Sequence, residues 1–318
     1  MSKEVDNFNK KYKTEVGLDN PEIDVLSKKI GNDGFKILCS IKFNKLEQLL
    51  LEENEISNID SLANNKFGDK LTAIDLSTNK LKSIDIFSKC NFPSLTHLFL
   101  NANQLTSIDV LAKVNFPSLK ELNLSSNKIK SIDVLQKVNF NTLRELDLSK
   151  NEINNIDVFA CIKFPELHQL TLDQNKITSI NPLGNFNCSK LEKLKLENNN
   201  LKSIDVLKNI DFSSLTYLSI GDDTLGDRVD CLKEIKFKVL EDLYLYLNDL
   251  INRETPKIQD IINYFEGKGI TFNFISCDDD NGRDVGLDDD LDFGGSNITD
   301  SKNNTGGFDF LLDNENIF

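Results

Sequence analysis

The chain has 318 residues, with 51 acidic and 37 basic side chains and a formal net charge of -14. Such an acidic balance argues against nucleic-acid binding, which needs a basic surface. Apolar residues make up 39% of the chain, which is enough for a packed core and excludes a wholly disordered protein. No stretch reaches the roughly 18 consecutive apolar residues that span a bilayer, so we expect no membrane partner.

The start of the chain and the cysteines indicate a cytoplasmic or nuclear protein. The first residues, MSKEVDNFNKKYK, contain no apolar segment of a secretory signal. The six cysteines are scattered without a CxxC pair, so we predict reduced thiols rather than a disulfide framework. They are Cys39, Cys90, Cys161, Cys188, Cys231 and Cys277.

Residues 1–45 are predicted to form an N-terminal flank and a helical cap with a half-repeat. Asn20 and Pro21 suit the N-cap and the first position of a helix. Ile23, Leu26 and Ile30 would then share one face of that helix. Residues 36–43 match the second half of the repeat that follows.

Residues 46–277 carry about nine units of a 24-residue repeat, each of which begins with the pattern LxxLxLxxNxI. The LxxLxL segment predicts a short strand with its leucines on one face, and stacked units predict a parallel sheet. The units open at Leu46, Leu71, Leu95, Leu119, Leu143, Leu167, Leu191, Leu215 and Leu240.

An asparagine column follows the strands. An amide both donates and accepts, so we predict that each asparagine satisfies backbone groups of adjacent turns. Asn248 continues the column, whereas Asp223 lacks the donor and predicts a weaker eighth unit. The other members are Asn54, Asn79, Asn103, Asn127, Asn151, Asn175 and Asn199.

A phenylalanine column precedes the openers and predicts a stacked aromatic spine in the core. Cys188 fills its one gap, with Phe186 close by. The column accounts for the abundance of phenylalanine in a chain without tryptophan. Its members are Phe43, Phe67, Phe92, Phe116, Phe140, Phe164, Phe212 and Phe237.

An aspartate column begins the segment after each strand and turn. We predict that these side chains are N-caps of short helices. The alternative, a ladder of calcium ions, needs more oxygen ligands per turn than one aspartate supplies. The column contains Asp60, Asp85, Asp109, Asp133, Asp157 and Asp205, with Asn181 interrupting it.

These repeats resemble the leucine-rich repeat family over residues 46 to about 275. The resemblance implies an α/β solenoid with a concave parallel sheet and a convex side of short helices or turns. The Ser-Ile-Asp-Val-Leu form is similar to intracellular eukaryotic members. Among these are the leucine-rich-repeat regulatory subunit of protein phosphatase 1 and the acidic leucine-rich nuclear phosphoproteins.

The C-terminal end of the repeats is predicted to be capped. Pro256 begins a helix of about ten residues, Gly267 and Gly269 end it, and residues 270–275 alternate like a last edge strand. Residues 278–318 hold 12 acids and 2 bases and are predicted to be a disordered tail. Two apolar islands, at 291–293 and 308–312, are either docking motifs for a second protein or part of a solubilising tail.

No catalytic or metal-binding motif stands out, and we predict a protein that is not an enzyme and has no cofactor. The two histidines, His97 and His168, lie three units apart on exposed strand positions. At the usual strand spacing they are about 14 Å apart, too far to share a metal or a proton.

The concave face is the expected binding surface of a solenoid. Thirteen acids and five bases occupy its outward positions, so we expect a protein partner with basic and apolar features. Aromatic and arginine side chains are common anchors of interfaces. The predicted contacts are His97, Phe99, Arg144, His168, Lys195, Tyr217, Tyr244 and Tyr246.

These features predict a non-enzymatic protein-interaction scaffold. Two alternatives stay open. One is a regulatory subunit of an enzyme such as protein phosphatase 1, as the resemblance implies. The other is an acidic nuclear protein that binds histones or other basic proteins.

Overall fold

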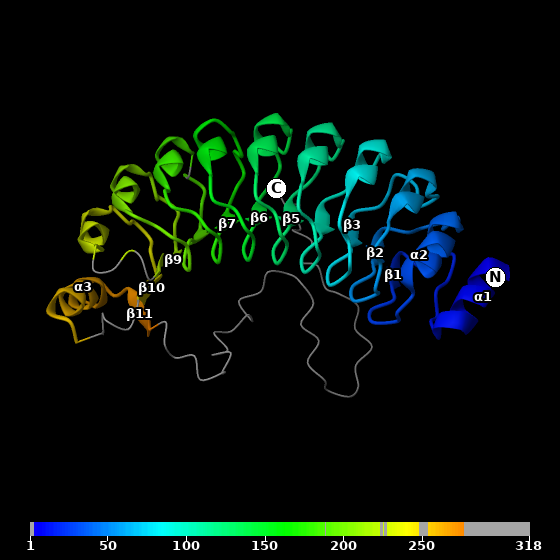
Figure 1. Cartoon of the computed structure of the whole chain (residues 1–318), viewed down its shortest axis with the longest axis horizontal. Coiled ribbons are helices and arrows are strands. Elements are labelled where there is room, and N and C mark those ends of the chain that lie inside the picture. The colour runs from blue at the N-terminus through cyan, green and yellow to red at the C-terminus, as the bar shows by residue number, and fades with distance from the viewer. Residues whose placement is uncertain (1–2, 188, 223–224, 226–227, 248–253, 277–318) are drawn as a thin grey trace, which may run out of the picture. The chain divides into compact units, whose positions relative to one another are not determined.

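Eleven short strands lie side by side in one parallel sheet, in the order β1 to β11, within the part of the chain that the computed structural model describes (Figure 1). Equivalent residues of successive units pair directly, as His97 of one strand does with Glu121 of the next. Each unit therefore adds one strand, and equivalent side chains form rows across the sheet. The strands are β1 (Glu22–Asp24), β2 (Gln48–Leu50), β3 (Ala73–Asp75), β4 (His97–Phe99), β5 (Glu121–Asn123), β6 (Glu145–Asp147), β7 (Gln169–Thr171), β8 (Lys193–Lys195), β9 (Tyr217–Asp222), β10 (Asp242–Leu247) and β11 (Thr271–Ser276).

The structure describes residues 3–187, 189–222, 225, 228–247 and 254–276. Several predictions fall outside these ranges. They concern Cys188 in the phenylalanine column, Asp223 and Asn248 in the asparagine column, and the acidic tail at 278–318 with its two apolar islands.

Short helices lie on the convex side, opposite the sheet (Figure 1). Each follows its strand after a turn and carries apolar residues that point back toward the sheet, such as Leu111 and Leu135. This arrangement confirms the predicted solenoid of a concave sheet and convex short helices. The convex elements are η1 (Asp60–Asn64), η2 (Asp85–Lys89), η3 (Asp109–Lys113), η4 (Asp133–Lys137), η5 (Asp157–Ala160), η6 (Asn181–Asn185), η7 (Asp205–Asn209) and η8 (Asp230–Glu234).

The core is a continuous apolar layer between the sheet and the convex helices. In the unit that opens at Leu95, the side chains of Leu95, Leu98 and Leu100 are fully buried. The same three positions are buried in the following units, because side chains along a strand alternate between its two faces. No single unit could cover its leucines alone, so the stacking of neighbours supplies the stability.

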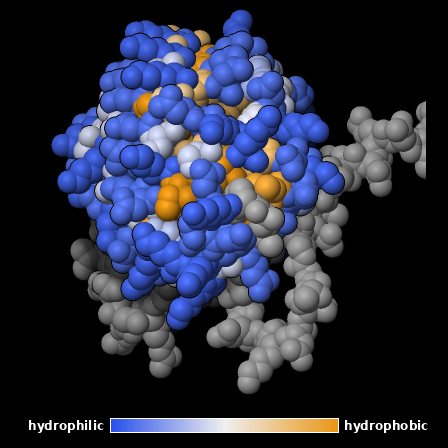
Figure 2. Space-filling model, turned by 90° about the vertical axis from the view of Figure 1, so that its right-hand side faces the viewer, coloured by the Kyte–Doolittle hydropathy of each residue, from blue (hydrophilic) through white to orange (hydrophobic). Residues whose placement is uncertain are grey.

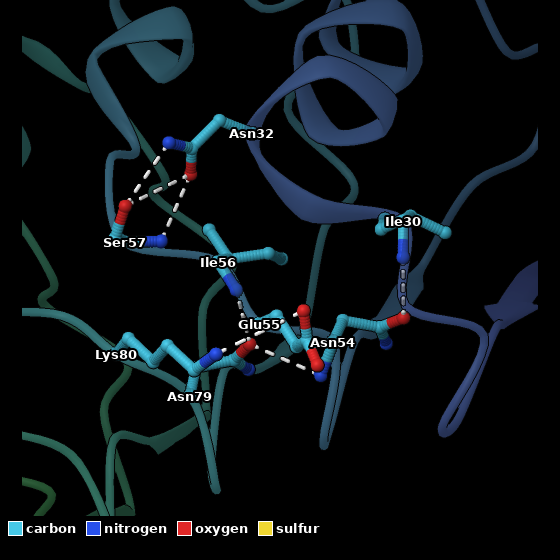
Figure 3. A network of polar contacts seen from close by, with 8 residues as sticks. All are labelled: Ile30, Asn32, Asn54, Glu55, Ile56, Ser57, Asn79 and Lys80. Atoms are coloured by element: carbon cyan, nitrogen blue, oxygen red, sulfur yellow. Dashed lines mark hydrogen bonds and ion pairs between the residues drawn. The ribbon is translucent and has the colours of Figure 1, made fainter.

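The asparagine column forms the predicted ladder (Figure 3). The Oδ1 atom of Asn79 accepts hydrogen bonds from the backbone N–H groups of Asn54 and Ile56, over 3.1 and 2.9 Å. Its Nδ2 atom donates to the carbonyl of Leu51, over 2.9 Å. Asn54 repeats the bond by accepting from the N–H of Ile30. Each buried amide thus joins its own turn to the preceding unit and leaves few turn groups unpaired.

The phenylalanine column is also present. Phe43 and Phe67 lie with ring centroids 6.2 Å apart, and Phe212 and Phe237 stack at 6.1 Å. Phe186 is buried and packs edge-on against a convex phenylalanine, Phe159. The rings fill the volume between successive convex helices and pack as core, as predicted.

The aspartates are not N-caps, so that prediction is wrong. Each convex helix has an isoleucine or valine as its cap residue, and the aspartate, or Asn181 in η6, is already the first helical residue. The bond at the helix start comes from the residue two positions earlier, as in Ser83, whose Oγ accepts from the N–H of Asp85 over 3.0 Å. The helix begins one residue earlier than expected, and the aspartate side chain is exposed to solvent.

The predicted N-terminal helix after Asn20 is likewise wrong. The segment forms strand β1, which pairs with β2, and Ile23, Val25 and Ile30 are buried like their counterparts in later units. Ile23 and Ile30 stand seven positions apart, a spacing that fits one face of a helix as well as two core positions of this repeat. The spacing alone therefore could not distinguish a helix from a strand. Residues 36–40 of the segment that matched a half-repeat lie in α2 (Gly31–Ser40), which packs beside η1.

A helix, α1 (Lys3–Tyr12), closes the N-terminal end of the solenoid. Its buried side chains, Val5 and Phe8, belong to the main core, and it packs on α2. Figure 2 shows this end, where hydrophilic residues cover most of the surface and small apolar areas lie between them. The cap therefore shields an end that stacking would leave apolar.

The C-terminal end agrees with the prediction. Helix α3 (Pro256–Glu266) begins at the proline and ends before Gly267, and Gly269 adopts a left-handed φ of 77°. Strand β11 then pairs with β10 along its whole length.

Candidate functional site

Three rows of side chains point outward from the concave sheet, at two, four and six residues after each opener. We call them the first, second and third outward rows. Over β6 to β10 the first row is Glu145, Gln169, Lys193, Tyr217 and Asp242. The second is Asp147, Thr171, Lys195, Ser219 and Tyr244. The third is Ser149, Asp173, Glu197, Gly221 and Tyr246.

Two predicted contact residues, His97 and Phe99, lie together on β4. Their ring centroids are 6.3 Å apart, and the His97 Nε2 atom lies 3.9 Å from a carboxylate oxygen of Glu121. Neither is an exposed residue, because His97 is half-buried and Phe99 is 7% exposed. Burial lowers the pKa of His97, and nearby Lys120 lowers it further.

Arg144 and His168 lie on neighbouring units, each directly before the first residue of its strand, and outside the three outward rows. The backbone N–H of His168 donates to the carbonyl of Arg144 over 2.8 Å. The His168 ring bonds through Nδ1 to the carbonyl of Glu166 over 2.6 Å. The structure therefore brings these two predicted residues together, but at the margin of the concave face.

The three tyrosines form what we call the tyrosine cluster: Tyr217 on β9, and Tyr244 and Tyr246 on β10. The rings of Tyr217 and Tyr244 stack with centroids 5.0 Å apart. The ammonium of Lys193 lies 5.1 Å from the Tyr217 centroid, within the range of a cation–π contact. All three rings are half-buried, and burial raises the pKa of Tyr217 and Tyr246, so their hydroxyls stay protonated.

Beside the tyrosine cluster lies a pair of carboxyl groups that the sequence did not single out. Asp173 and Glu197 occupy adjacent places in the third outward row, and the N–H of Gln174 donates to the Glu197 carbonyl over 2.9 Å. Their exposed fractions are only 6% and 7%. Burial raises the pKa of both groups, and for Asp173 the charge of Glu197 adds to the effect. The nearby Ser219 hydroxyl partly offsets the rise at Glu197, and Lys195 partly offsets the rise at both acids.

Four oxygen atoms of this region are buried without a hydrogen-bond partner: Asp173 Oδ1, Glu197 Oε2, Thr171 Oγ1 and Ser219 Oγ. Thr171 is 3% exposed and Ser219 is fully buried. We call Thr171, Asp173, Glu197 and Ser219 the concave polar site. Buried polar groups are nearly always paired, so such a group of unpaired oxygens marks a surface that a bound molecule could complete.

The sequence held one signal for this site. Two acids stand 24 residues apart at the same outward position, which predicts that they are neighbours on the sheet. The burial of Thr171 and Ser219 has no such signal, because it depends on the larger residues beside them. Of the predicted contacts, Lys195 and the tyrosine cluster adjoin the concave polar site, whereas His97 and Phe99 lie on β4.

The described residues contain no group of three or more histidine, cysteine or acidic side chains that could hold a metal ion. In the same part of the chain, every helix is too short or too polar to cross a bilayer.

Comparisons with known proteins agree with the repeat and its geometry. Family models described as leucine-rich repeats match residues 93–137 and 117–177. The chain carries leucine-rich repeats over these residues. Its repeats extend beyond the matched residues in both directions, since strands recur from β1 to β11 and convex helices from η1 to η8, and the asparagine ladder runs from Asn54 to Asn199.

Solved structures of two bacterial proteins are similar to this chain. Internalin C2 from Listeria monocytogenes is 24% identical and has a TM-score of 0.52, and the match covers 67% of this chain and 93% of that one. An internalin, InlF, from the same organism is 22% identical with a TM-score of 0.48, and the match covers 86% and 88% of the two chains. No curated protein sequence matches the chain.

Proposed function

We propose that this leucine-rich repeat protein is a non-enzymatic interaction module that binds a protein partner on its concave face, over β8 to β10. Leucine-rich repeats generally serve as protein-interaction modules, and the concave sheet is the usual binding surface of a solenoid. The observation that carries the proposal is the tyrosine cluster beside the concave polar site. Stacked, half-buried tyrosines are typical interface anchors.

Unpaired buried oxygens beside these rings support the same proposal. A partner that donates hydrogen bonds would relieve the cost of leaving them unpaired. On a concave surface that faced only water, these oxygens would be expected to be hydrated. Lys195 and the remaining predicted contacts extend the proposed interface toward β4, with His97 and Phe99 as a second group and Arg144 and His168 at the margin.

The wider proposal includes a cytoplasmic or nuclear location. Four described cysteines are free thiols, as a reducing compartment favours: Cys39, Cys90, Cys161 and Cys231. The narrower hypotheses, a phosphatase regulatory subunit or a binder of histones, differ in the partner they expect. A phosphatase that copurifies with the chain after removal of 278–318 would support the first. Loss of a basic partner on that deletion would support the second.

Photocrosslinking tests the proposal directly. A photoreactive phenylalanine analogue replaces Tyr217 or Tyr244 in cells that make the protein, and a matched control carries it at the exposed convex residue Gln136. We expect protein adducts from the two concave positions and none from Gln136. Adducts confined to the convex control, or a lack of adducts at both concave positions, would contradict the proposal.

A further inference from the structure

We propose that the concave polar site binds an arginine side chain of the protein partner. This inference rests on the proposed function, because it names the chemical group that the partner inserts into the concave face. It assigns the anchoring role to Asp173 and Glu197, with Thr171 and Ser219 as neutral acceptors.

The unpaired atoms of the site match the donors of a guanidinium group. All four are oxygens that accept hydrogen bonds, and each belongs to a residue that is at least nine-tenths buried. Ionised Asp173 and Glu197 only accept, while the hydroxyls of Thr171 and Ser219 can rotate to do so. A guanidinium group offers five N–H donors in one plane and no acceptor, so it can pair with several of these oxygens at once.

The charges around the site also favour a cation. Three buried carboxyl groups, those of Asp147, Asp173 and Glu197, face two ammonium groups, those of Lys193 and Lys195. Burial raises the pKa of all three acids, and for Asp173 the charges of Glu197 and Asp147 raise it further. One added cation would neutralise this excess of carboxylates. Further titratable groups interact with these side chains, namely Glu145, Asp242, Tyr217, Tyr244 and Tyr246.

The tyrosine cluster favours arginine over the other biological cations. Tyr217 and Tyr244 stack on each other and border the site, and a guanidinium plane stacks on aromatic rings more readily than a lysine ammonium does. A metal ion fits poorly, because the described residues do not gather three suitable ligands. The site therefore suits a flat organic cation.

Entry to the site requires side-chain movement. Lys195 and Tyr246 are half-buried and flank the buried oxygens, so we expect both to change rotamer when the arginine binds. Such rotamer changes are common at interfaces whose backbone stays fixed.

Peptide selection tests the inference with a defined probe. Random dodecapeptides displayed on phage are selected on the immobilised full chain, and the enriched peptides are synthesised with each arginine kept or replaced by citrulline. Citrulline has nearly the same shape without the charge. We expect an arginine in the enriched peptides and a loss of affinity of at least about tenfold with citrulline. This comparison uses the wild-type chain and does not depend on the folding of a variant.

The double variant Asp173→Asn/Glu197→Gln should lose affinity by a similar factor. The matched control, Asp205→Asn/Glu234→Gln, makes the same two changes at exposed convex residues and should bind normally. Peptides that bind equally with citrulline but lose binding in Tyr217→Ala would overturn the arginine assignment and leave the proposed function standing. Peptides that bind independently of every concave substitution would overturn both.

Discussion

The Oγ atom of Ser107 accepts a hydrogen bond from the backbone N–H of Asp109, over 3.1 Å. This bond pairs the first N–H of the convex helix η3 and recurs in the same form at Ser131 and Asp133. The serine of each Ser-Ile-Asp segment, rather than its aspartate, therefore satisfies the start of the helix.

Replacement of that serine should weaken the solenoid more than replacement of the aspartate. Ser107→Ala leaves the Asp109 N–H to water, and we expect a loss of about 0.5–1 kcal/mol in the free energy of unfolding. Asp109→Ala removes an exposed side chain that forms no cap bond and should have a smaller effect. Urea unfolding of the two variants measures the difference. A larger loss in the free energy of unfolding for Asp109→Ala than for Ser107→Ala would indicate that the aspartate is the capping residue.

Removal of a ladder amide should be among the most damaging single changes. The Nδ2 atom of Asn127 donates to the carbonyls of Leu100 and Leu124, and its Oδ1 atom accepts from the N–H of Leu105 over 2.9 Å. Asn127→Ala leaves these buried groups unpaired, so we expect a loss of about 2–4 kcal/mol. Half-buried Asn101 lies outside the ladder, and Asn101→Ala is the control. Similar urea midpoints for the two variants would refute the structural role of the ladder.

Gly221 is required by a close approach of two strands. Its φ is +116°, and a Cβ atom there would meet the backbone carbonyl of Tyr246. Gly221→Ala combines strain with overlap and should cost more than about 3 kcal/mol. Gly68 has a φ of +84° with open space around it, so Gly68→Ala isolates the strain and should cost about 1 kcal/mol. Thermal unfolding of both variants gives the comparison, and equal losses would argue against the overlap.

The rows of the sheet were predictable because each depends on a fixed spacing. The leucine and asparagine positions recur every 24 residues or so, and this period alone predicts the parallel strands and the ladder. The first unit was missed because Asn20 stands where later units have a leucine, and its apolar spacing also suits a helix. The aspartate role was missed because the sequence does not show at which residue a helix begins.

The candidate site was only partly predictable, for a different reason. Tyr217 and Tyr244 are conspicuous in sequence and do meet on the concave face. Whether an outward carboxyl group is solvated or buried depends on its neighbours in the adjacent strands. Asp173 and Glu197 look like ordinary surface acids until the packing around them is known.

The stability of the chain should fall as the pH rises from about 4 to about 7. Asp173 and Glu197 titrate near pH 4 in the unfolded chain, whereas burial raises the pKa of Asp173 to about 7 and that of Glu197 above its usual value. The folded state therefore binds more protons across this window, and its stability declines as those protons leave.

Asp173→Asn/Glu197→Gln should flatten this part of the pH profile and be more stable than the wild-type chain at pH 7.5. Urea unfolding at pH 5 and pH 7.5 measures both effects. Asp205→Asn is the control. In the wild-type chain, Ser203 and Lys208 lower the pKa of the Asp205 carboxyl, so this variant should not flatten the fall in stability between pH 4 and pH 7. An unchanged profile in the double variant would show that the pair is solvated.

The dissociation constant of the crosslinked partner tests concave binding most directly. It is measured by calorimetry for Tyr217→Ala/Tyr244→Ala/Tyr246→Ala and for a control, Lys89→Ala/Lys113→Ala/Lys137→Ala, that truncates three exposed convex side chains. We predict binding about a hundredfold weaker in the tyrosine variant, because it loses the anchors of the interface, and nearly unchanged binding in the control. A folded tyrosine variant that binds its partner with wild-type affinity would contradict this prediction.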